Sequence, residues 1–326
     1  MRRPPSPATA RRSRGLARAA ASCLRGVLLA GAAFCAGAAP RPTLGVLFPD
    51  VGAPYGRIFE QILGGIEDAT GANTVTRRLD RYTEPAEVAR WAQRHDLDAV
   101  VTLGRGPLSL ARAAGLEQPV IAGAATFTPD DTRDIDALSL VPAPDAVFRN
   151  LVRLAPRVER INVVYEPGRD DWLVQRATAA ASAHDLELRA RSARDLAASA
   201  VLHRDVMSEQ APHASVWLLR NERLVDDRTV LPLVLEQSWQ RHWITFSNDP
   251  ASVKRGVLFA LYPDQRGMGQ RLARMAQDRI DRPERPHRLA LLDSVRIAVN
   301  VRTASHLGLH FTAALRRQFD IVFPSP

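Results

Sequence analysis

Cysteine is almost absent from this sequence, and lysine is rarer still. The 326 residues include two cysteines, Cys23 and Cys35, and Lys254 is the one lysine among 44 basic residues. Because both cysteines fall within the first 39 residues, the rest of the chain can form no disulfide, no thiolate metal site and no cysteine nucleophile.

Long apolar runs are missing as well. The apolar stretch of residues 26–39 is shorter than the about 20 residues that a membrane-spanning helix needs. Residues 1–39 hold seven arginines and no acidic residue, and Ala36-Gly37-Ala38 has the small-residue pattern of a signal-peptide cleavage site. We therefore predict that residues 1–39 are a cleaved secretory signal peptide, with an uncleaved anchor as the alternative. The protein is expected to be periplasmic.

The chain has little net charge once this leader is set aside. The whole sequence carries a formal charge of +9, but residues 40–326 contain 37 basic and 35 acidic residues. A nucleic-acid-binding protein needs a concentrated basic face, and no basic run follows residue 40. We expect no nucleic-acid partner.

Short apolar runs alternate with amphipathic stretches after residue 40. Strands are expected at residues 44–48, 74–79, 99–103, 120–122, 161–165, 186–189, 215–219 and 243–246. Helices are expected at residues 58–69, 85–95, 107–114, 146–154 and 172–184. Such alternation predicts an α/β fold with mostly parallel sheets. The pattern runs through twice, which predicts two similar lobes with a first crossover at residues 141–144.

Ligands of open α/β sheets bind beyond the carboxyl ends of the strands, in the loops that lead into helices. The sequence places these loops at residues 49–55, 104–107, 123–128, 166–171, 220–223 and 247–250. A binding site is therefore expected among the side chains of these loops.

Residues 297–309, IAVNVRTASHLGL, carry the most specific family resemblance. They are similar to the ending of the ABC-transporter substrate-binding family that includes tryptophan- and tyrosine-type binding proteins. Upstream, residues 252–256, an apolar strand, Asp264 and Gly269 follow in the order of that family. The resemblance extends over nearly all of residues 43–320, although most of it rests on order and spacing.

This resemblance implies a type I periplasmic binding protein architecture, in which two Rossmann-like lobes are joined by a hinge. Lobe 1 is expected to hold residues 40–141 and about 250–286, and lobe 2 residues 142–249 and about 287–326. The resemblance also implies a small-molecule ligand and an ABC permease in the inner membrane as partner, and we expect a monomer without a cofactor. The family's ligand does not carry over, because the loops at residues 104–107 and 220–223 are unusually charged.

Two of the loops offer charged ligand contacts. Arg105 and Gly106 open a helix, where free backbone N–H groups attract anions and an arginine can hold a carboxylate. A tight turn with Arg105 in solvent explains the pattern equally well. Ser247 and Asp249 follow another strand, and the resemblance places a ligand-contacting Ser/Asp loop near them. Asp249 is suited to receive an ammonium group or to cap the next helix.

The remaining candidates have weaker support. Tyr55 could close over a ring-shaped ligand or pack at a helix start. Glu166 and Arg169 could contact ligand, bridge the lobes or simply be solvated. Thr126 and Asn221 are candidates by position alone.

Signatures of enzymes and metal sites are missing from the sequence. It has no G-x-S-x-G, no H-E-x-x-H and no carboxylate-rich metal loop. His306 and His310 have the spacing of metal ligands, but His310 follows Gly308, where the helix is expected to end. We predict no catalytic residue and no metal site.

The sequence therefore predicts a binding protein and not an enzyme. It would be the periplasmic solute-binding component of an ABC importer, closing two lobes on a small, carboxylate-bearing, amino-acid-like ligand. One alternative is a periplasmic sensor subunit for a signalling partner. Another is an exported hydrolase or isomerase with Glu166 or Asp249 as general base.

Overall fold

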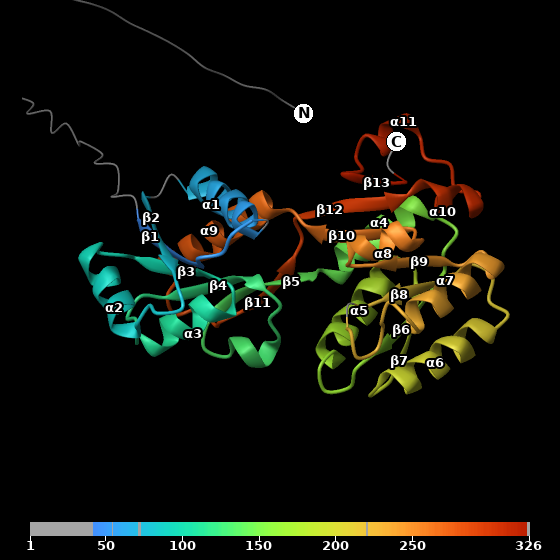
Figure 1. Ribbon diagram of the computed structural model, residues 1–326, viewed down its shortest axis with the longest axis horizontal. Coiled ribbons are helices and arrows are strands. Elements are labelled where there is room, and N and C mark those ends of the chain that lie inside the picture. The colour runs from blue at the N-terminus through green and yellow to red at the C-terminus, as the bar shows by residue number, and fades with distance from the viewer. Residues whose placement is uncertain (1–41, 54, 71–72, 220, 325–326) are drawn as a thin grey trace, which may run out of the picture. The chain divides into compact units, whose positions relative to one another are not determined.

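The computed structural model describes residues 42–53, 55–70, 73–219 and 221–324 (Figure 1). The predicted signal peptide, both cysteines and Arg220 lie outside these residues. Within them, no helix is both long and apolar enough to cross a bilayer.

The first sheet has six parallel strands in the order β11-β5-β4-β3-β1-β2. Its strands are β1 (Thr43–Pro49), β2 (Asn73–Leu79), β3 (Ala99–Leu103), β4 (Val120–Ala125), β5 (Asp136–Pro142) and β11 (Leu289–Leu292). The helices packed on it are α1 (Tyr55–Thr70), α2 (Pro85–Arg94), α3 (Arg105–Ala113) and α9 (Gln265–Asp281), and a short 3-10 helix spans Pro129–Thr132. We call this sheet with its helices lobe 1.

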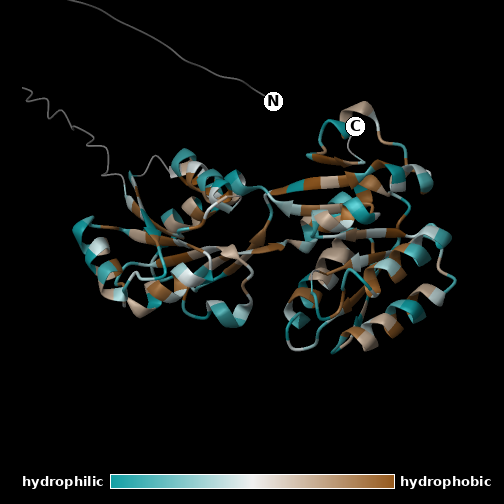
Figure 2. Cartoon of the chain, in the orientation of Figure 1, coloured by the Kyte–Doolittle hydropathy of each residue, from teal (hydrophilic) through white to brown (hydrophobic). Residues whose placement is uncertain are grey.

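Both faces of this sheet are covered, which explains why its inner strands β1 (TLGVLFP) and β3 (AVVTL) are mostly apolar at successive positions. Side chains of one strand alternate between the faces. On β1, Val46 joins the core with Ile62 of α1 and Met268 of α9, whereas Leu47 joins the core with Trp91 of α2. Figure 2 shows mostly apolar residues along the strands, whereas the helices carry both apolar and polar residues.

The second sheet has seven strands in the order β13-β12-β10-β9-β8-β6-β7, and only the β10–β12 pair is antiparallel. Its strands are β6 (Arg160–Tyr165), β7 (Glu187–Ser192), β8 (Ala214–Leu218), β9 (Ile244–Ser247), β10 (Phe259–Pro263), β12 (Val295–Asn300) and β13 (Ile321–Phe323). Its helices are α4 (Pro144–Leu154), α5 (Asp171–Ala183), α6 (Leu196–Ser208), α7 (Val230–Arg241), α8 (Pro250–Arg255), α10 (Val301–His306) and α11 (Ala313–Arg316). We call this sheet with its helices lobe 2.

The predicted fold class, two α/β lobes with mostly parallel sheets, is confirmed. The chain passes between the sheets three times: after β5, after β10 and after β11. The first passage lies at the crossover predicted for residues 141–144.

The lobe boundaries differ from the expected ones in two places. Residues 250–263, expected in lobe 1, form α8 and β10 of lobe 2, because Phe259 pairs with Phe246 of β9 and stacks on its ring. Residues 289–292, expected in lobe 2, form β11 of lobe 1, because this strand pairs with β5.

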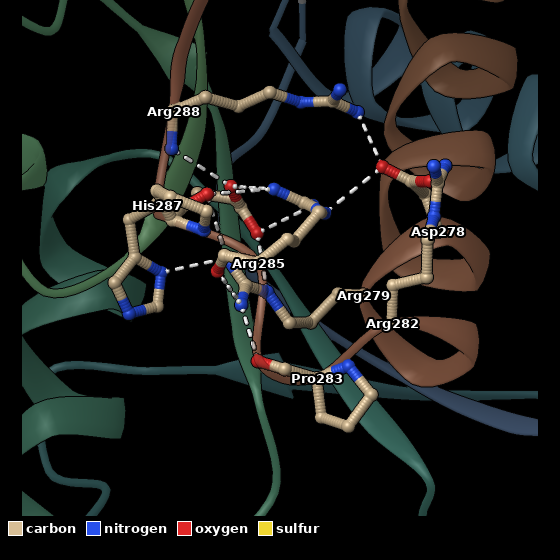
Figure 3. A network of polar contacts seen from close by, with 9 residues as sticks. Asp278, Arg279, Arg282, Pro283, Arg285, His287 and Arg288 are labelled. Carbon is tan, nitrogen blue, oxygen red and sulfur yellow. Dashed lines mark hydrogen bonds and ion pairs between the residues drawn. The ribbon is translucent and has the colours of Figure 1, made fainter.

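A buried carboxylate anchors the connection between α9 and β11 (Figure 3). Asp136, the fully buried first residue of β5, accepts hydrogen bonds from Arg279 (2.8 Å) and Arg285 (2.8 and 2.9 Å). It also accepts one from the backbone N–H of Arg288 (3.0 Å). Burial raises the pKa of Asp136, but the guanidinium hydrogen bonds outweigh it and hold the pKa below its usual value. This network ties the segment that precedes β11 to the start of β5.

We expect Asp136→Ala to lower the free energy of unfolding by about 3–5 kcal/mol, because it leaves Arg279 buried without its carboxylate. Asp281→Ala is the control, because Asp281 is exposed at the end of α9, the helix that carries Arg279. This substitution should lower the free energy of unfolding by less than about 0.5 kcal/mol. Urea denaturation at neutral pH measures both. Equal midpoints for the two variants would contradict this role of Asp136.

Helices α1 and α9 touch through their backbones at two glycines. A Cβ on Gly65 would lie 2.0 Å from the carbonyl oxygen of Arg266, and a Cβ on Gly269 would lie 2.0 Å from that of Ile62. Neither distance is possible without moving a helix. The close contact brings α9 onto the core of lobe 1, although α9 follows β10 of lobe 2 in the chain.

Gly65→Ala should therefore destabilise the protein by about 2 kcal/mol or more, since overpacking forces the backbone to shift. The neighbouring Gly64→Ala meets only the flexible end of Arg266, at 3.3 Å, and should be close to neutral. Thermal unfolding of the two variants gives the comparison. A Gly65→Ala variant as stable as Gly64→Ala would show that the helices are not in this contact.

Candidate functional site

A pocket of about 430 Å³ lies at the carboxyl ends of β8 and β9 in lobe 2. It is lined by Leu218, Leu219, Asn221, Glu222, Val225, Asp226, Asp227, Leu231, Ser247, Asn248, Asp249 and Ser252. The strand ends position it, because the loops that follow neighbouring parallel strands meet at the same edge of a sheet. Three of the predicted site residues, Asn221, Ser247 and Asp249, come together here.

Glu166 supports the loop that carries Asn221. Asn221 Nδ2 donates to Glu166 Oε2 (2.9 Å), Arg223 donates to Oε1, and Arg169 NH1 lies 3.6 Å from Oε2. The Asn221 hydrogen bond first, and then the two guanidiniums, hold the pKa of Glu166 below its usual value. Glu166 is 8% exposed. An ionised carboxylate with these partners positions a loop, and its low pKa disfavours a role as general base.

Ser247 and Asp249 shape the turn into α8. Ser247 Oγ lies 2.6 Å from Ser252 Oγ and accepts the backbone N–H of Asp249 (3.1 Å). Asp249 Oδ1 accepts the backbone N–H of Ala251 (3.1 Å), so Asp249 caps α8. Capping was one of the two roles predicted for it. The cap fixes the Asp249 carboxylate at the border of the pocket.

The described lining of this pocket is acidic. It contains the carboxylates of Glu222, Asp226, Asp227 and Asp249 and no basic side chain. Burial raises the pKa of Asp226, but backbone N–H groups of Val230 (2.9 Å) and other residues outweigh it and lower the pKa. Asp226 is therefore ionised at neutral pH. Asp227 is paired with Arg255 (2.9 Å), and the other three carboxylates of this wall attract a cationic group.

Sequence reasoning missed Asp226 and Asp227. It ended the loop after β8 at residue 223, whereas the loop continues to the start of α7 at Val230. The Asp226-Asp227 pair ahead of an apolar helix was the available signal.

Two candidates of lobe 1, Arg105 and Thr126, lie next to each other but outside this pocket. Arg105 forms a two-pronged ion pair with Asp131, at 3.0 Å on each side, and donates to the carbonyl oxygen of Thr126 (2.5 Å). Its hydrogen bond is the main reason why the pKa of Asp131 falls to about 2. Arg105 is 57% exposed and already has a carboxylate partner within the chain.

Tyr55 and Gly106 complete the predicted set. Tyr55 begins α1 and is 63% exposed, and Gly106 is exposed in the first turn of α3. In the described part of the chain, no hydrogen bond or ion pair joins either residue to another candidate. Their roles as ligand contacts stay predictions, as does that of Arg105.

No group of three or more His, Cys, Asp or Glu residues in the described ranges is arranged to hold a metal ion.

Comparison with known proteins gives no family model and no curated protein that matches this chain. Among solved structures, the chain is similar to the ligand-free, open structure of a substrate-binding protein with adhesive properties from Clostridium difficile. The TM-score is 0.59 at 13% identity, over 87% of this chain and 100% of that one. The two proteins share a fold. The predicted type I periplasmic binding protein architecture is thereby confirmed.

Two further structures are more distant. A conserved domain protein from Vibrio cholerae has a TM-score of 0.49 at 15% identity, over 86% of this chain and 99% of that one. A domain from Streptococcus pneumonia in complex with L-Trp has a TM-score of 0.46 at 17% identity, over 86% of this chain and 100% of that one.

The Arg105–Asp131 pair gives stability that depends on pH. Because the pKa of Asp131 is lowered in the folded state, its contribution is present above pH 3.8 and is lost as the pH falls through that value towards 2. Asp131→Asn should lower the free energy of unfolding by at most about 1 kcal/mol near neutral pH, since the pair is partly exposed. Urea denaturation at a series of pH values should show this difference vanish in acid. A difference that is the same at every pH would contradict the ion pair.

Proposed function

We propose that the protein is the solute-binding component of an ABC importer, exported to the periplasm, and that its ligand binds at the carboxyl edge of lobe 2. The pocket described above carries this proposal. Its volume of about 430 Å³ is in the range of small-molecule sites, and the fold places it where α/β sheets bind ligands.

The charge of the pocket suggests the part of the ligand that it receives. Four carboxylates line it, and the loop that holds Asn221 is kept in place by Glu166. A ligand with an ammonium group would pair with this wall, as an amino-acid-like molecule does. The carboxylate of such a ligand would lie away from the wall.

Closure of the lobes would complete the site. The three segments between the sheets lie against one another: Ala143 N–H donates to Leu292 O (2.8 Å), and Asp264 N–H donates to Ser294 O (3.2 Å). Bending at these segments would move one lobe against the other, as in hinge closure. Ligand would favour the closed form of the protein. In this form the protein, as a monomer, would bind its membrane permease.

A binding role is preferred to an enzymatic one. Of the two residues considered as general bases, Glu166 has a lowered pKa and Asp249 caps a helix. Neither arrangement favours proton abstraction.

The test begins with a thermal-shift screen against amino acids, amines, organic acids and sugars. A ligand at 100 times its Kd stabilises a protein by about 2.7 kcal/mol, which raises the melting temperature measurably. We expect a hit with an ammonium group, and Asp249→Asn should then raise its Kd about tenfold or more, because Asn keeps the cap and removes the charge.

Asp195→Asn is the matched control, since Asp195 caps α6 in the same lobe by accepting the N–H of Ala198 (2.8 Å). Its Kd should equal that of the unmodified protein. Turnover of the ligand would refute the proposed function. Equal affinities of Asp249→Asn and Asp195→Asn for the ligand would refute the proposed site.

A further inference from the structure

Lobe 2 has a second pocket, of about 700 Å³, that the proposed function does not use. It is lined by Leu235, Glu236, Trp239, Gln240, Lys254, Arg255, Gly256, Asn300, Arg302, Thr303, Phe323 and Pro324. Because β12 runs antiparallel to β10, Asn300 at the end of β12 lies beside the start of β10. The pocket is thus towards the amino edge of the sheet, whereas the candidate site is at the carboxyl edge.

The floor of this second pocket is fixed by hydrogen bonds within the protein. Asn300 Nδ2 donates to Val253 O (2.8 Å), and its Oδ1 accepts the N–H groups of Arg302 and Thr303, each at 3.0 Å. Thr303 Oγ1 donates to Gly256 O (2.9 Å). Asn300 and Thr303 are each 7% exposed. The floor needs no ligand to form.

One wall is a supported aromatic ring. Trp239 is 43% exposed and lines the pocket. His306 stacks on it with ring centroids 3.5 Å apart and planes at 5°, and His242 stacks on His306 in turn. A hydrogen bond of 2.8 Å between His306 Nε2 and Trp239 O holds the pair. Neither histidine lines the pocket, so they brace the indole from outside it. Phe323 and Leu235 add apolar surface.

The charges at the rim are mostly positive. The rim contains three basic side chains, those of Lys254, Arg255 and Arg302, and one carboxylate, that of Glu236. Arg255 is paired with Asp227 at 2.9 Å. Within the described ranges, the side chains of Lys254 and Arg302 are exposed and form no ion pair. Two cations beside an indole and a phenyl ring suit an anion that carries a flat apolar ring.

We propose that this pocket, between Trp239 and the cations Lys254 and Arg302, is a second binding site for small aromatic carboxylates. The ring of the ligand packs on Trp239, Phe323 and Leu235. Its carboxylate pairs with Lys254 and Arg302. Its volume of about 700 Å³ accommodates a two-ring molecule.

The probe is 1-naphthoate, which has no ammonium group and so cannot satisfy the acidic pocket. Equilibrium dialysis and ligand-observed NMR compare it with its neutral amide, 1-naphthamide, and with the cationic 1-naphthylmethylamine. We expect the carboxylate to bind about tenfold more tightly than the amide, since two exposed ion pairs together contribute about that factor. The amine should bind most weakly of the three.

Three variants assign the site. Lys254→Gln with Arg302→Gln should remove the preference for carboxylate over amide, whereas Trp239→Ala should weaken both. Arg317→Gln changes an exposed arginine of lobe 2 that does not line the pocket, and Asp249→Asn changes the other pocket; both should bind 1-naphthoate like the unmodified protein. Circular dichroism confirms that each variant is folded.

Two results would overturn this proposal. One is the absence of 1-naphthoate binding by the unmodified protein at millimolar concentration. The other is a carboxylate preference that persists in the Lys254→Gln, Arg302→Gln variant or that disappears in Asp249→Asn. An absence of 1-naphthoate binding, or a preference that persists in the Lys254→Gln, Arg302→Gln variant, leaves the proposed ammonium site in the acidic pocket untouched, so the two proposals can fail independently.

Discussion

The structure depends on the place where three chain segments pass between its two sheets. There the backbone N–H of Ala143 donates a hydrogen bond to the carbonyl oxygen of Leu292, and that of Asp264 donates one to the carbonyl oxygen of Ser294. Each sheet is therefore completed by residues distant in sequence: β11 and α9 return to lobe 1, and β12 and β13 return to lobe 2. Neither lobe is a continuous stretch of chain, so the folding of each requires the crossings.

The same arrangement determines where chemistry is available. Parallel strands turn their carboxyl ends to one edge, and in lobe 2 the loops after β8 and β9 build an acidic pocket there. The polar groups of these loops are used twice. Asp249 caps α8 through its hydrogen bond with Ala251 and also contributes charge to the pocket, whereas Asn221 lines the pocket and is held by Glu166 of the loop after β6. The antiparallel strand β12 breaks this rule for the sheet and brings Asn300 and Arg302 to another pocket.

Much of the fold could be predicted because buried parallel strands are apolar at successive positions. Residues 44–48 and 99–103 stand out for this reason and form β1 and β3. β5 was missed because its sequence, DALSLVP, begins with the buried Asp136 and contains two more interruptions. The charge of Asp136 is neutralised by Arg279 and Arg285. These residues lie more than 140 positions away, so no local sequence pattern shows the pairing.

The site was predictable in part for a related reason. Position after a strand selected Asn221, Ser247 and Asp249, which line one pocket, and their contact with a ligand stays a prediction. It could not show that Arg105 of α3 is held by Asp131 of the short 3-10 helix, since the two residues are 26 positions apart. Nor could it show the acidity of the pocket, because Asp226 and Asp227 lie beyond residue 223, where the loop was expected to end. Charge partners and loop paths are tertiary properties, and the ligand class depends on them.

The central claim is that ligand binds at the carboxyl edge of lobe 2, and hydrogen–deuterium exchange tests it most directly. With a ligand found by screening, exchange should slow in residues 221–229 and 247–252, which form the pocket, and at the crossings near residues 143, 264 and 293. Slower exchange confined to other parts of the protein, with these loops unchanged, would contradict the account.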